Sequence, residues 1–237
     1  MEITPDKKKV IGLVEQAYLG SLCLPNFQRD FVWNREEIAD LLRSILRGYF
    51  LGSLLMLSTD PQRPPFAPIA LRGAKPQLAE LQPEHLILDG QQRLTSLLYA
   101  LYAPNLELKN SKKPRRYFIN LELLHADPDN DSIVVDKTER EISREGLNSL
   151  ETQWSKRLLP VTNLNSDAAF LRWRDGIDDW LRENHPDEHL RFREEWREQW
   201  TNVVQQFLSF EVPVIKLPQV NEDDQDSVAR ICAIFEK

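Results

Sequence analysis

Residues 86–101 read LILDGQQRLTSLLYAL, and this stretch decides the fold. It opens with the apolar triplet Leu86-Ile87-Leu88, which is typical of a short buried strand. Leucines then recur with the spacing of one buried helix face, at Leu94, Leu97, Leu98 and Leu101. The sequence therefore predicts a strand, a tight polar turn and a helix that packs on a core.

The turn itself, residues 89–93, has the chemistry of an anion site. Unpaired backbone N–H groups and the positive end of the helix dipole meet at such a turn. Gly90 lets the backbone approach a ligand, Gln91 and Gln92 offer neutral hydrogen bonds, and Arg93 carries a permanently charged fork for phosphate oxygens. The pattern favours a nucleotide or phosphate pocket. A helix cap followed by an ordinary polar first turn is the alternative.

A second Gln-Arg pair lies upstream, in LPNFQRDFVW at residues 24–33. Gln28 and Arg29 are flanked there by aromatic residues, among them Phe27 and Trp33, whose rings can stack on a base or a cation. We expect the two pairs to converge on one pocket. The alternative is a half-buried extended segment whose alternating rings face inward.

Four segments occur in order along the chain: PNFQR at 25–29, SILRG at 44–48, GSLL at 52–55 and LDGQQRLTSL at 88–97. Together they resemble the N-terminal domain of GmrSD-type proteins, a family similar to the ParB and sulfiredoxin nucleotide-binding fold. The resemblance is close over residues 22–103 and looser afterwards, where 117–121 and 231–237 fit a later strand and helix. It implies a mixed α/β fold, in which a small mixed sheet with helices is followed by a mainly helical extension.

The domain organisation predicted from this pattern has three consecutive parts. A ParB-like nucleotide-binding core spans 1–124, a mainly helical extension spans 125–210, and 211–237 returns a strand and a helix to the core. The final helix has no terminating residue before Lys237, which predicts a chain cut inside a longer polypeptide.

Several further elements follow from local patterns. Asn34 and Glu37 form a capping box for a helix that ends at Gly48. A proline-rich loop at 61–76 should hold neither a ladder nor a helix, and 125–130 should be a polar turn. The remaining expected elements are strands at 54–57, 117–119, 133–135 and 212–217, and two amphipathic helices with aromatic rows at 170–181 and 192–207.

The resemblance also implies a function. Members of the family are similar to NTP-hydrolysing regulatory parts of modification-dependent restriction and phage-defence systems, in which the turn at 89–93 handles the nucleotide. The implied ligands and partners are a nucleoside triphosphate with Mg²⁺, DNA that carries a modification, and an HNH-type nuclease in the same or a separate chain. A homo-oligomer stays open. Two alternatives are a DNA-binding sensor that does not hydrolyse nucleotide and an assembly module that reports to a nuclease.

We expect phosphoryl transfer to water, with the protein mainly positioning groups and neutralising charge. Asp89 would orient water or Mg²⁺, or would only cap the helix. The residues expected to take part in catalysis are Asp89, Gln92, Arg93 and Gln28. The residues expected to bind the nucleotide are Gly90, Gln91, Arg93, Arg29, Thr95 and Trp33.

Composition narrows the remaining classes. The chain has 237 residues, 41% of them hydrophobic, and a net charge of −7, which argues against a protein that coats nucleic acid along its whole surface. The basic cluster at 109–116 either contacts DNA phosphates or is a solvated connector beside a strand edge. The absence of any apolar run near ~18 residues predicts a cytoplasmic protein without a membrane span. Cys23 and Cys232 should be small buried residues, since two isolated cysteines form neither a disulfide framework nor a zinc site.

Overall fold

The computed structural model describes residues 4–75, 81–220, 226, 228, 229 and 231. The chain divides into two compact units. Unit 1 comprises 1–33, 51–99 and 211–237, and unit 2 comprises 34–50 and 100–210. The two units interleave along the chain, whereas the sequence predicted consecutive segments ending at 124 and 210. The helix after residue 34 packs mainly against the strand at 134–138 and the helix at 197–208, which places 34–50 in unit 2.

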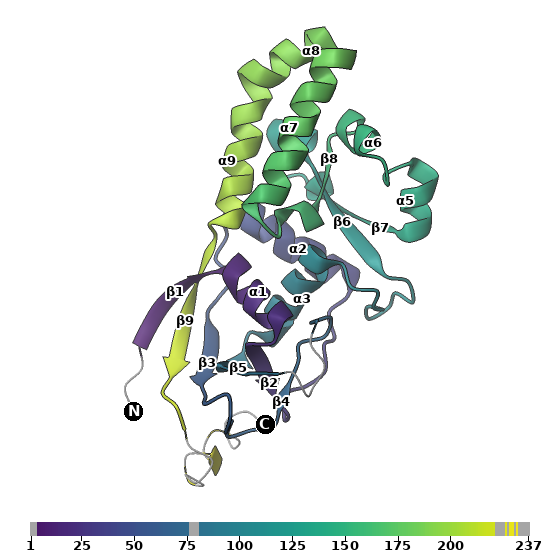
Figure 1. Cartoon of the computed structure of the whole chain (residues 1–237). Helices are drawn as coiled ribbons and strands as arrows, with labels where there is room; N and C mark the ends of the chain where they lie inside the picture. Colours follow the sequence, from purple (N-terminus) through teal and green to yellow (C-terminus); the bar gives the residue numbers. More distant parts are fainter. Residues whose placement is uncertain (1–3, 76–80, 221–225, 227, 230, 232–237) are drawn as a thin grey trace. The chain divides into compact units, whose positions relative to one another are not determined.

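Unit 1 contains a mixed six-stranded sheet (Figure 1). Its spatial order is β1-β9-β3-β5-β2-β4. The strands are β1 (Thr4–Lys9), β2 (Leu22–Pro25), β3 (Leu54–Ser58), β4 (Pro68–Ile69), β5 (His85–Asp89) and β9 (Glu211–Leu217). Strands β9 and β3 pair in parallel, as do β5 and β2, and the other three neighbouring pairs are antiparallel. The predicted strand at 212–217 therefore does return to the sheet of the first part of the chain.

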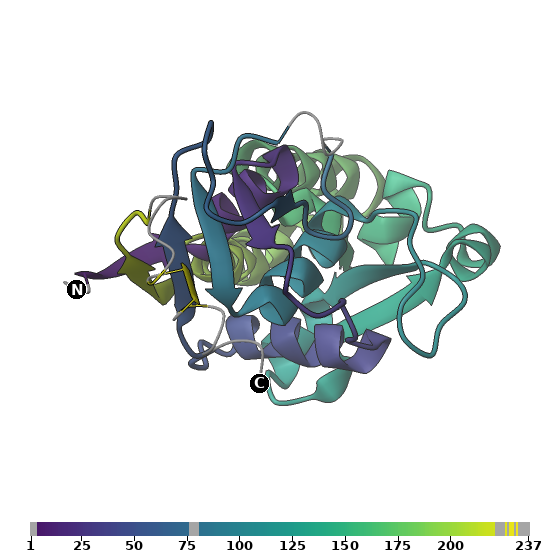
Figure 2. The same ribbon diagram turned by 90° about the horizontal axis from the view of Figure 1, so that it is seen from below.

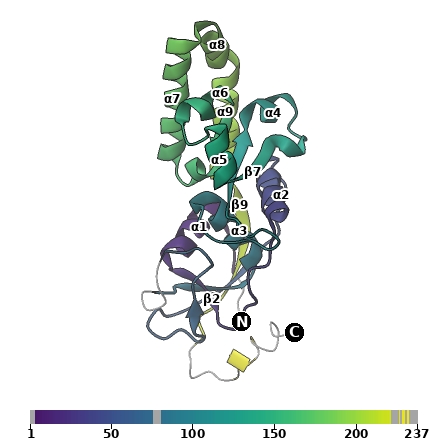
Figure 3. The same ribbon diagram turned by 90° about the vertical axis from the view of Figure 1, so that its right-hand side faces the viewer.

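Strand β5 and helix α3 (Gln91–Tyr102) form the predicted strand-turn-helix unit. The apolar triplet of β5 is buried, and the four leucines of the α3 stripe are each at most 2% exposed. Helix α1 (Val10–Leu19) lies next to α3 beside the sheet in Figures 1 and 3. Cys23 on β2 is fully buried as expected, and burial raises the pKa of its thiol to about 11. Cys232 lies outside the described residues.

The proline-rich loop contains one short strand, which corrects the expectation that 61–76 holds no ladder. Strand β4 pairs antiparallel with β2, so that Pro68 lies opposite Pro25 and Ile69 opposite Leu24. Proline is tolerated because β4 is the last strand of the sheet, where an N–H on the outer side is not needed. The end of the loop, from Pro76, lies outside the described residues.

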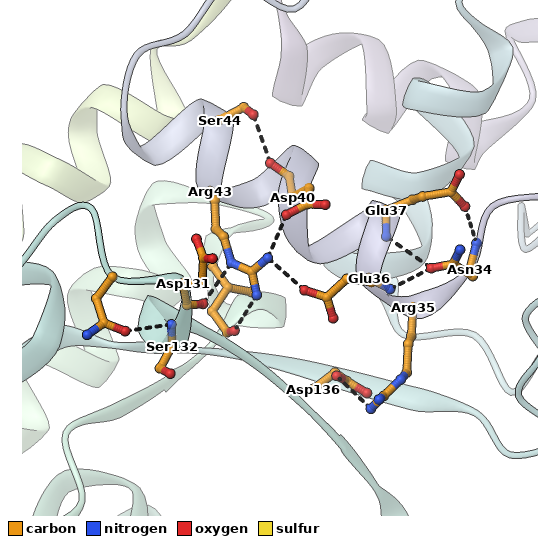
Figure 4. A network of polar contacts seen from close by, with 12 residues as sticks. Asn34, Arg35, Glu36, Glu37, Asp40, Arg43, Ser44, Asp131, Ser132 and Asp136 are labelled. Atoms are coloured by element: carbon orange, nitrogen blue, oxygen red, sulfur yellow. Dashed lines mark hydrogen bonds and ion pairs between the residues drawn. The ribbon is translucent and has the colours of Figure 1, made fainter.

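Unit 2 begins with helix α2 (Arg35–Leu46), whose start is the predicted capping box. The Asn34 side chain accepts hydrogen bonds from the backbone N–H groups of Glu36 and Glu37, at 2.8 and 3.2 Å, and the Glu37 carboxylate accepts one from the Asn34 N–H at 2.7 Å (Figure 4). Three N–H groups at the helix start, which would lack partners within the helix, are thereby satisfied.

Arg43 connects α2 to the chain at 131–134. It is only 6% exposed, and its guanidinium donates to the carbonyl oxygens of Asp131 at 2.7 Å and Val134 at 3.4 Å. The same group lies 2.8 Å from the Glu36 carboxylate and 2.6 Å from that of Asp40 (Figure 4). A charge buried this far is therefore paired, which is the condition under which burial is tolerated.

Beyond α2, unit 2 combines a three-stranded antiparallel sheet with helices. The sheet order is β7-β6-β8, and two of its strands are the paired teal arrows of Figure 2. The strands are β6 (Arg115–Asn120), β7 (Val134–Thr138) and β8 (Leu158–Pro160). The α-helices are α4 (Leu121–Ala126), α5 (Glu139–Glu145), α6 (Leu150–Ser155), α7 (Asp167–Asn184), α8 (Pro186–Arg191) and α9 (Arg197–Leu208). Helix α4 takes up the first part of the expected turn at 125–130, so the turn begins only after Ala126.

One predicted aromatic row lies on α7, and the other lies on the stretch from α8 to α9. Helices α7 and α9 run side by side in Figures 1 and 3. The α7 row is buried as expected at Phe170, Trp173, Ile177 and Leu181, but the prediction was wrong at Trp180, which is only half-buried. For the second row, the prediction of burial was wrong at two positions, because Trp196 and Val203 are only half-buried. A π-helical turn at Phe192–Trp196 resets the register, and Val204 takes the core position instead.

Two expectations about charge and apolar runs can also be compared with the structure. Arg115 forms an ion pair with Asp136 at 3.2 Å, and Arg116 forms one with Glu139 at 3.0 Å. These pairs favour the connector interpretation of the basic cluster, since two of its cations already have carboxylate partners.

Across the described ranges, no helix is both long and apolar enough to cross a membrane.

Candidate functional site

The two Gln-Arg motifs meet within unit 1, as the sequence predicted. The Gln28 side chain donates to the carbonyl oxygen of Leu88 at 2.7 Å, and that of Gln92 donates to the carbonyl of Asp30 at 2.9 Å. Gln92 also accepts a hydrogen bond from the backbone N–H of Val32 at 3.0 Å. The amide side chains thus fix the loop at 26–33 against the turn between β5 and α3.

Gly90 forms the sharp step from β5 into α3. Its φ is +94°, a left-handed conformation that favours glycine, and its carbonyl accepts the first bond of the helix from Leu94. A Cβ at this position would lie 2.1 Å from Cδ2 of Leu54. Packing against β3, and not only approach to a ligand, therefore requires glycine here.

Arg93 is already bound to backbone carbonyls. Its guanidinium donates to Leu51 and, at 2.9 Å, to Ser53, and it lies 3.7 Å from the carboxylate of Asp89. Gly52 makes room for this arrangement, since a Cβ there would lie 2.6 Å from Nη1 of Arg93. Arg93 thus holds the turn at 51–53, which the sequence did not reveal because the partners are main-chain atoms far along the chain.

A cavity of about 210 Å³, here called the motif cavity, opens where the two motifs meet. Its lining contains eight of the nine predicted site residues: Gln28, Arg29, Trp33, Asp89, Gly90, Gln91, Gln92 and Arg93. Thr95 is the exception, because it is 2% exposed and lines the next cavity. The N-terminus of α3 adds backbone N–H groups that have no partner within the helix.

The charged side chains of the motif cavity differ in how far they are already bound by other groups of the protein. Arg29 is exposed, with its carbonyl, not its guanidinium, bound to the Gln91 amide. The Asp89 side chain is 68% exposed and is the single carboxylate of the lining. This arrangement can take an anion at the helix terminus, held by Arg29, with Asp89 at its edge.

The Mg²⁺ expected at Asp89 could be held there only together with phosphate groups of a substrate. Among the described residues, no group of three or more His, Cys, Asp or Glu side chains is placed to hold a metal ion. Mg²⁺ does not need such a cage, because it is commonly held by one or two carboxylates together with substrate phosphates. Asp89 is compatible with Mg²⁺ binding by one carboxylate together with substrate phosphates.

A larger cavity of about 600 Å³, here called the neighbouring cavity, shares Gln28, Arg29 and Gln91 with the motif cavity. Most of its other walls were not predicted. They come from the loop around Phe31 and from residues 69–72 beside β4. No pattern in the sequence indicates the contribution of 69–72, because this loop contains no motif and reaches the site through the pairing of β4 with β2.

Unit 2 contains a third cavity, of about 430 Å³, beside the π-helical turn. The Trp196 ring stacks on that of Trp200 at 5.8 Å, and the guanidiniums of Arg157 and Arg191 lie over Trp196. Each of these arginines is already paired with a glutamate. The two arginines of this cavity therefore offer no uncompensated positive charge to an anion, which makes it the weaker candidate for a phosphate site.

Comparison with known proteins places the chain in a family. The family model described as "GmrSD restriction endonuclease, N-terminal domain" matches residues 10–237. An uncharacterized protein of Methanocaldococcus jannaschii is 35% identical over 246 aligned positions, which cover 100% of this chain and 39% of that relative. The chain therefore spans about two fifths of the length of the curated relative that it matches. By the extent of the family match, this chain belongs to the GmrSD restriction endonuclease N-terminal domain family and is thereby associated with DNA restriction.

Proposed function

We propose that the motif cavity binds the phosphate groups of a nucleoside triphosphate and that the chain hydrolyses the nucleotide as the regulatory part of a modification-dependent restriction or phage-defence system. One observation carries the proposal: two motifs that lie 60 residues apart converge on the N-terminus of a twelve-residue helix and enclose a polar cavity there. Helix N-termini with an adjacent guanidinium are suited to phosphate.

The proposed roles follow the contacts of each side chain. The first N–H groups of α3 and the guanidinium of Arg29 bind phosphate oxygens. Gln92 is a positioning residue, since both ends of its amide hold the 30–32 backbone. Gln28 is better placed to orient the attacking water, because the structure records only its Nε2 donating, to Leu88. Arg93 fixes the turn at 51–53 and adds positive charge to the cavity wall.

Mg²⁺ would enter together with the nucleotide and contact Asp89, where it would neutralise phosphate charge. DNA that carries a modification, and an HNH-type nuclease in the same or another chain, are the proposed partners. Both rest on family membership, and this chain covers only 39% of its relative. A homo-oligomer is an open part of the same proposal.

A second candidate is favoured by the amide and guanidinium contacts themselves. Gln91, Gln92 and Arg93 all bind main-chain atoms of unit 1, as they would if the motif served mainly to hold two loops together. In that case the chain is a DNA-binding sensor or an assembly module that binds without hydrolysis. Salt-dependent DNA binding without nucleotide turnover would favour this candidate.

An assay of phosphate release from nucleotide by the purified chain distinguishes hydrolysis from binding without hydrolysis. ATP, CTP, GTP and UTP are assayed with Mg²⁺, with and without DNA. The proposal predicts release from at least one nucleotide, and a large loss of release at saturating nucleotide in a Gln28→Ala variant. Binding of a nucleotide without release under any of these conditions would favour the second candidate.

A further inference from the structure

The neighbouring cavity differs from the motif cavity in size and in the character of its walls. It has a volume of about 600 Å³, against about 210 Å³ for the motif cavity. Small-molecule sites usually measure about 300–1,000 Å³. The motif cavity is therefore too small to enclose a whole nucleotide, whereas the neighbouring cavity falls within the usual range.

One side of the neighbouring cavity is apolar. Its lining includes Phe31 and Val32 from the loop after β2, and Ile69 and Ala70 at the end of β4. The residues Val32 and Ile69 are 40% and 41% exposed, so apolar surface remains open to solvent there. A ring placed against this side would bury apolar area that water now covers.

The boundary between the two cavities contains an unsatisfied acceptor. Gln91 lines both cavities and is only 5% exposed. Its Nε2 donates to the carbonyl of Arg29, while its Oε1 is buried without a hydrogen-bond partner among the described residues. A buried acceptor without a donor is costly, and a hydroxyl or N–H group of a ligand would satisfy it. The carboxylate of Asp30 is a second acceptor in the same lining.

We propose that the neighbouring cavity holds the nucleoside of the triphosphate whose phosphate groups occupy the motif cavity. This inference rests on the proposed function of the motif cavity. The shared residues Gln28, Arg29 and Gln91 join the two cavities, so one extended ligand reaches from one into the other. The base lies against the apolar side, and the two ribose hydroxyls donate toward Gln91 and Asp30.

Inorganic tripolyphosphate separates this inference from the proposal on which it rests. Calorimetric titrations compare tripolyphosphate with ATP, CTP, GTP and UTP on the full chain. Tripolyphosphate has the same chain of three phosphates but no nucleoside. We expect at least one nucleotide to bind tenfold or more tightly than tripolyphosphate. Equal affinities for tripolyphosphate and for all four nucleotides would overturn the nucleoside site and leave the phosphate site in place. If neither tripolyphosphate nor any nucleotide bound, the phosphate site and the nucleoside site would both be overturned.

Two variants of opposite volume locate the nucleoside. Ala70→Phe fills the neighbouring cavity, and Ile69→Ala removes part of its apolar side at a position that is already 41% exposed. Both should reduce nucleotide affinity, Ala70→Phe to the level of tripolyphosphate and Ile69→Ala by about threefold, while tripolyphosphate affinity stays constant in each. Ala67→Phe is the matched control, because Ala67 is an exposed alanine of the same loop that lines neither cavity, and it should behave like the natural chain. Retention of the full nucleotide advantage in both variants contradicts the inference.

Discussion

Arg29 and Arg93 carry the two guanidinium groups of the motif cavity, and they differ in what already binds them. Arg93 donates to two main-chain carbonyls, whereas the Arg29 side chain is exposed. From the sequence, both motifs and their convergence could be predicted, because they are recognisable in residue type and order. The main-chain partners of Gln91, Gln92 and Arg93 could not, since any carbonyl can accept and nothing in the sequence marks which one does.

Arg29→Ala should weaken nucleotide binding with little effect on stability. A charge-assisted hydrogen bond contributes about 1.5–3 kcal/mol, so affinity should fall roughly tenfold or more. Calorimetric titration of nucleotide measures the change. Arg63→Ala is the control, because Arg63 is an exposed arginine of unit 1 that lines neither the motif cavity nor the neighbouring cavity. An unchanged affinity in folded Arg29→Ala would remove Arg29 from the phosphate site.

Gly90→Ala should destabilise the chain for two separate reasons. The backbone has φ +94°, which a Cβ disfavours, and the new methyl group would lie 2.1 Å from Leu54 Cδ2. We expect a loss of about 2 kcal/mol or more in the free energy of unfolding, measured by urea denaturation. In a Leu54→Ala background the same substitution should cost less, because only the backbone strain remains. Equal costs in the two backgrounds would show that the contact with Leu54 does not constrain the turn.

At the scale of elements, the start of α2 is the most local feature of the fold. Asn34→Ala removes the acceptor of two N–H groups and should lower the free energy of unfolding of unit 2 by about 1 kcal/mol. Asn34→Asp keeps an oxygen in place and should retain the cap. Chemical denaturation monitored by far-UV circular dichroism compares the two. If both variants lost the same stability, the cap would not be the cause.

Which elements could be predicted follows from how local their causes are. The α2 cap, the β5-α3 unit and, apart from Trp180, the α7 row depend on neighbouring residues, and these were predicted. Strand β4 was missed because two residues that include a proline form a strand only through pairing with β2. The displacement of Trp196 from the core was missed because a single π turn shifts the helical period, and a regular pattern of apolar residues does not reveal it.

For the whole molecule, the division into two units has a consequence for ligand binding. Both the motif cavity and the neighbouring cavity are lined entirely by residues of unit 1. A ligand at 100 times its dissociation constant stabilises the state that binds it by about 2.7 kcal/mol. Nucleotide should therefore slow hydrogen exchange of the amides in β5 and in the first turns of α3. Exchange within α7 of unit 2 serves as the internal reference, and equal slowing there would contradict binding confined to unit 1.

The central claim is that nucleotide phosphate groups bind at the N-terminus of α3. The most direct test is a titration of ¹⁵N-labelled chain with nucleotide and Mg²⁺, followed through the backbone amide signals. We predict that the largest chemical-shift changes occur at the N–H groups of Gly90, Gln91, Gln92 and Arg93, and that they are much reduced in Arg29→Ala. Saturable binding that leaves these four signals unmoved would contradict the account.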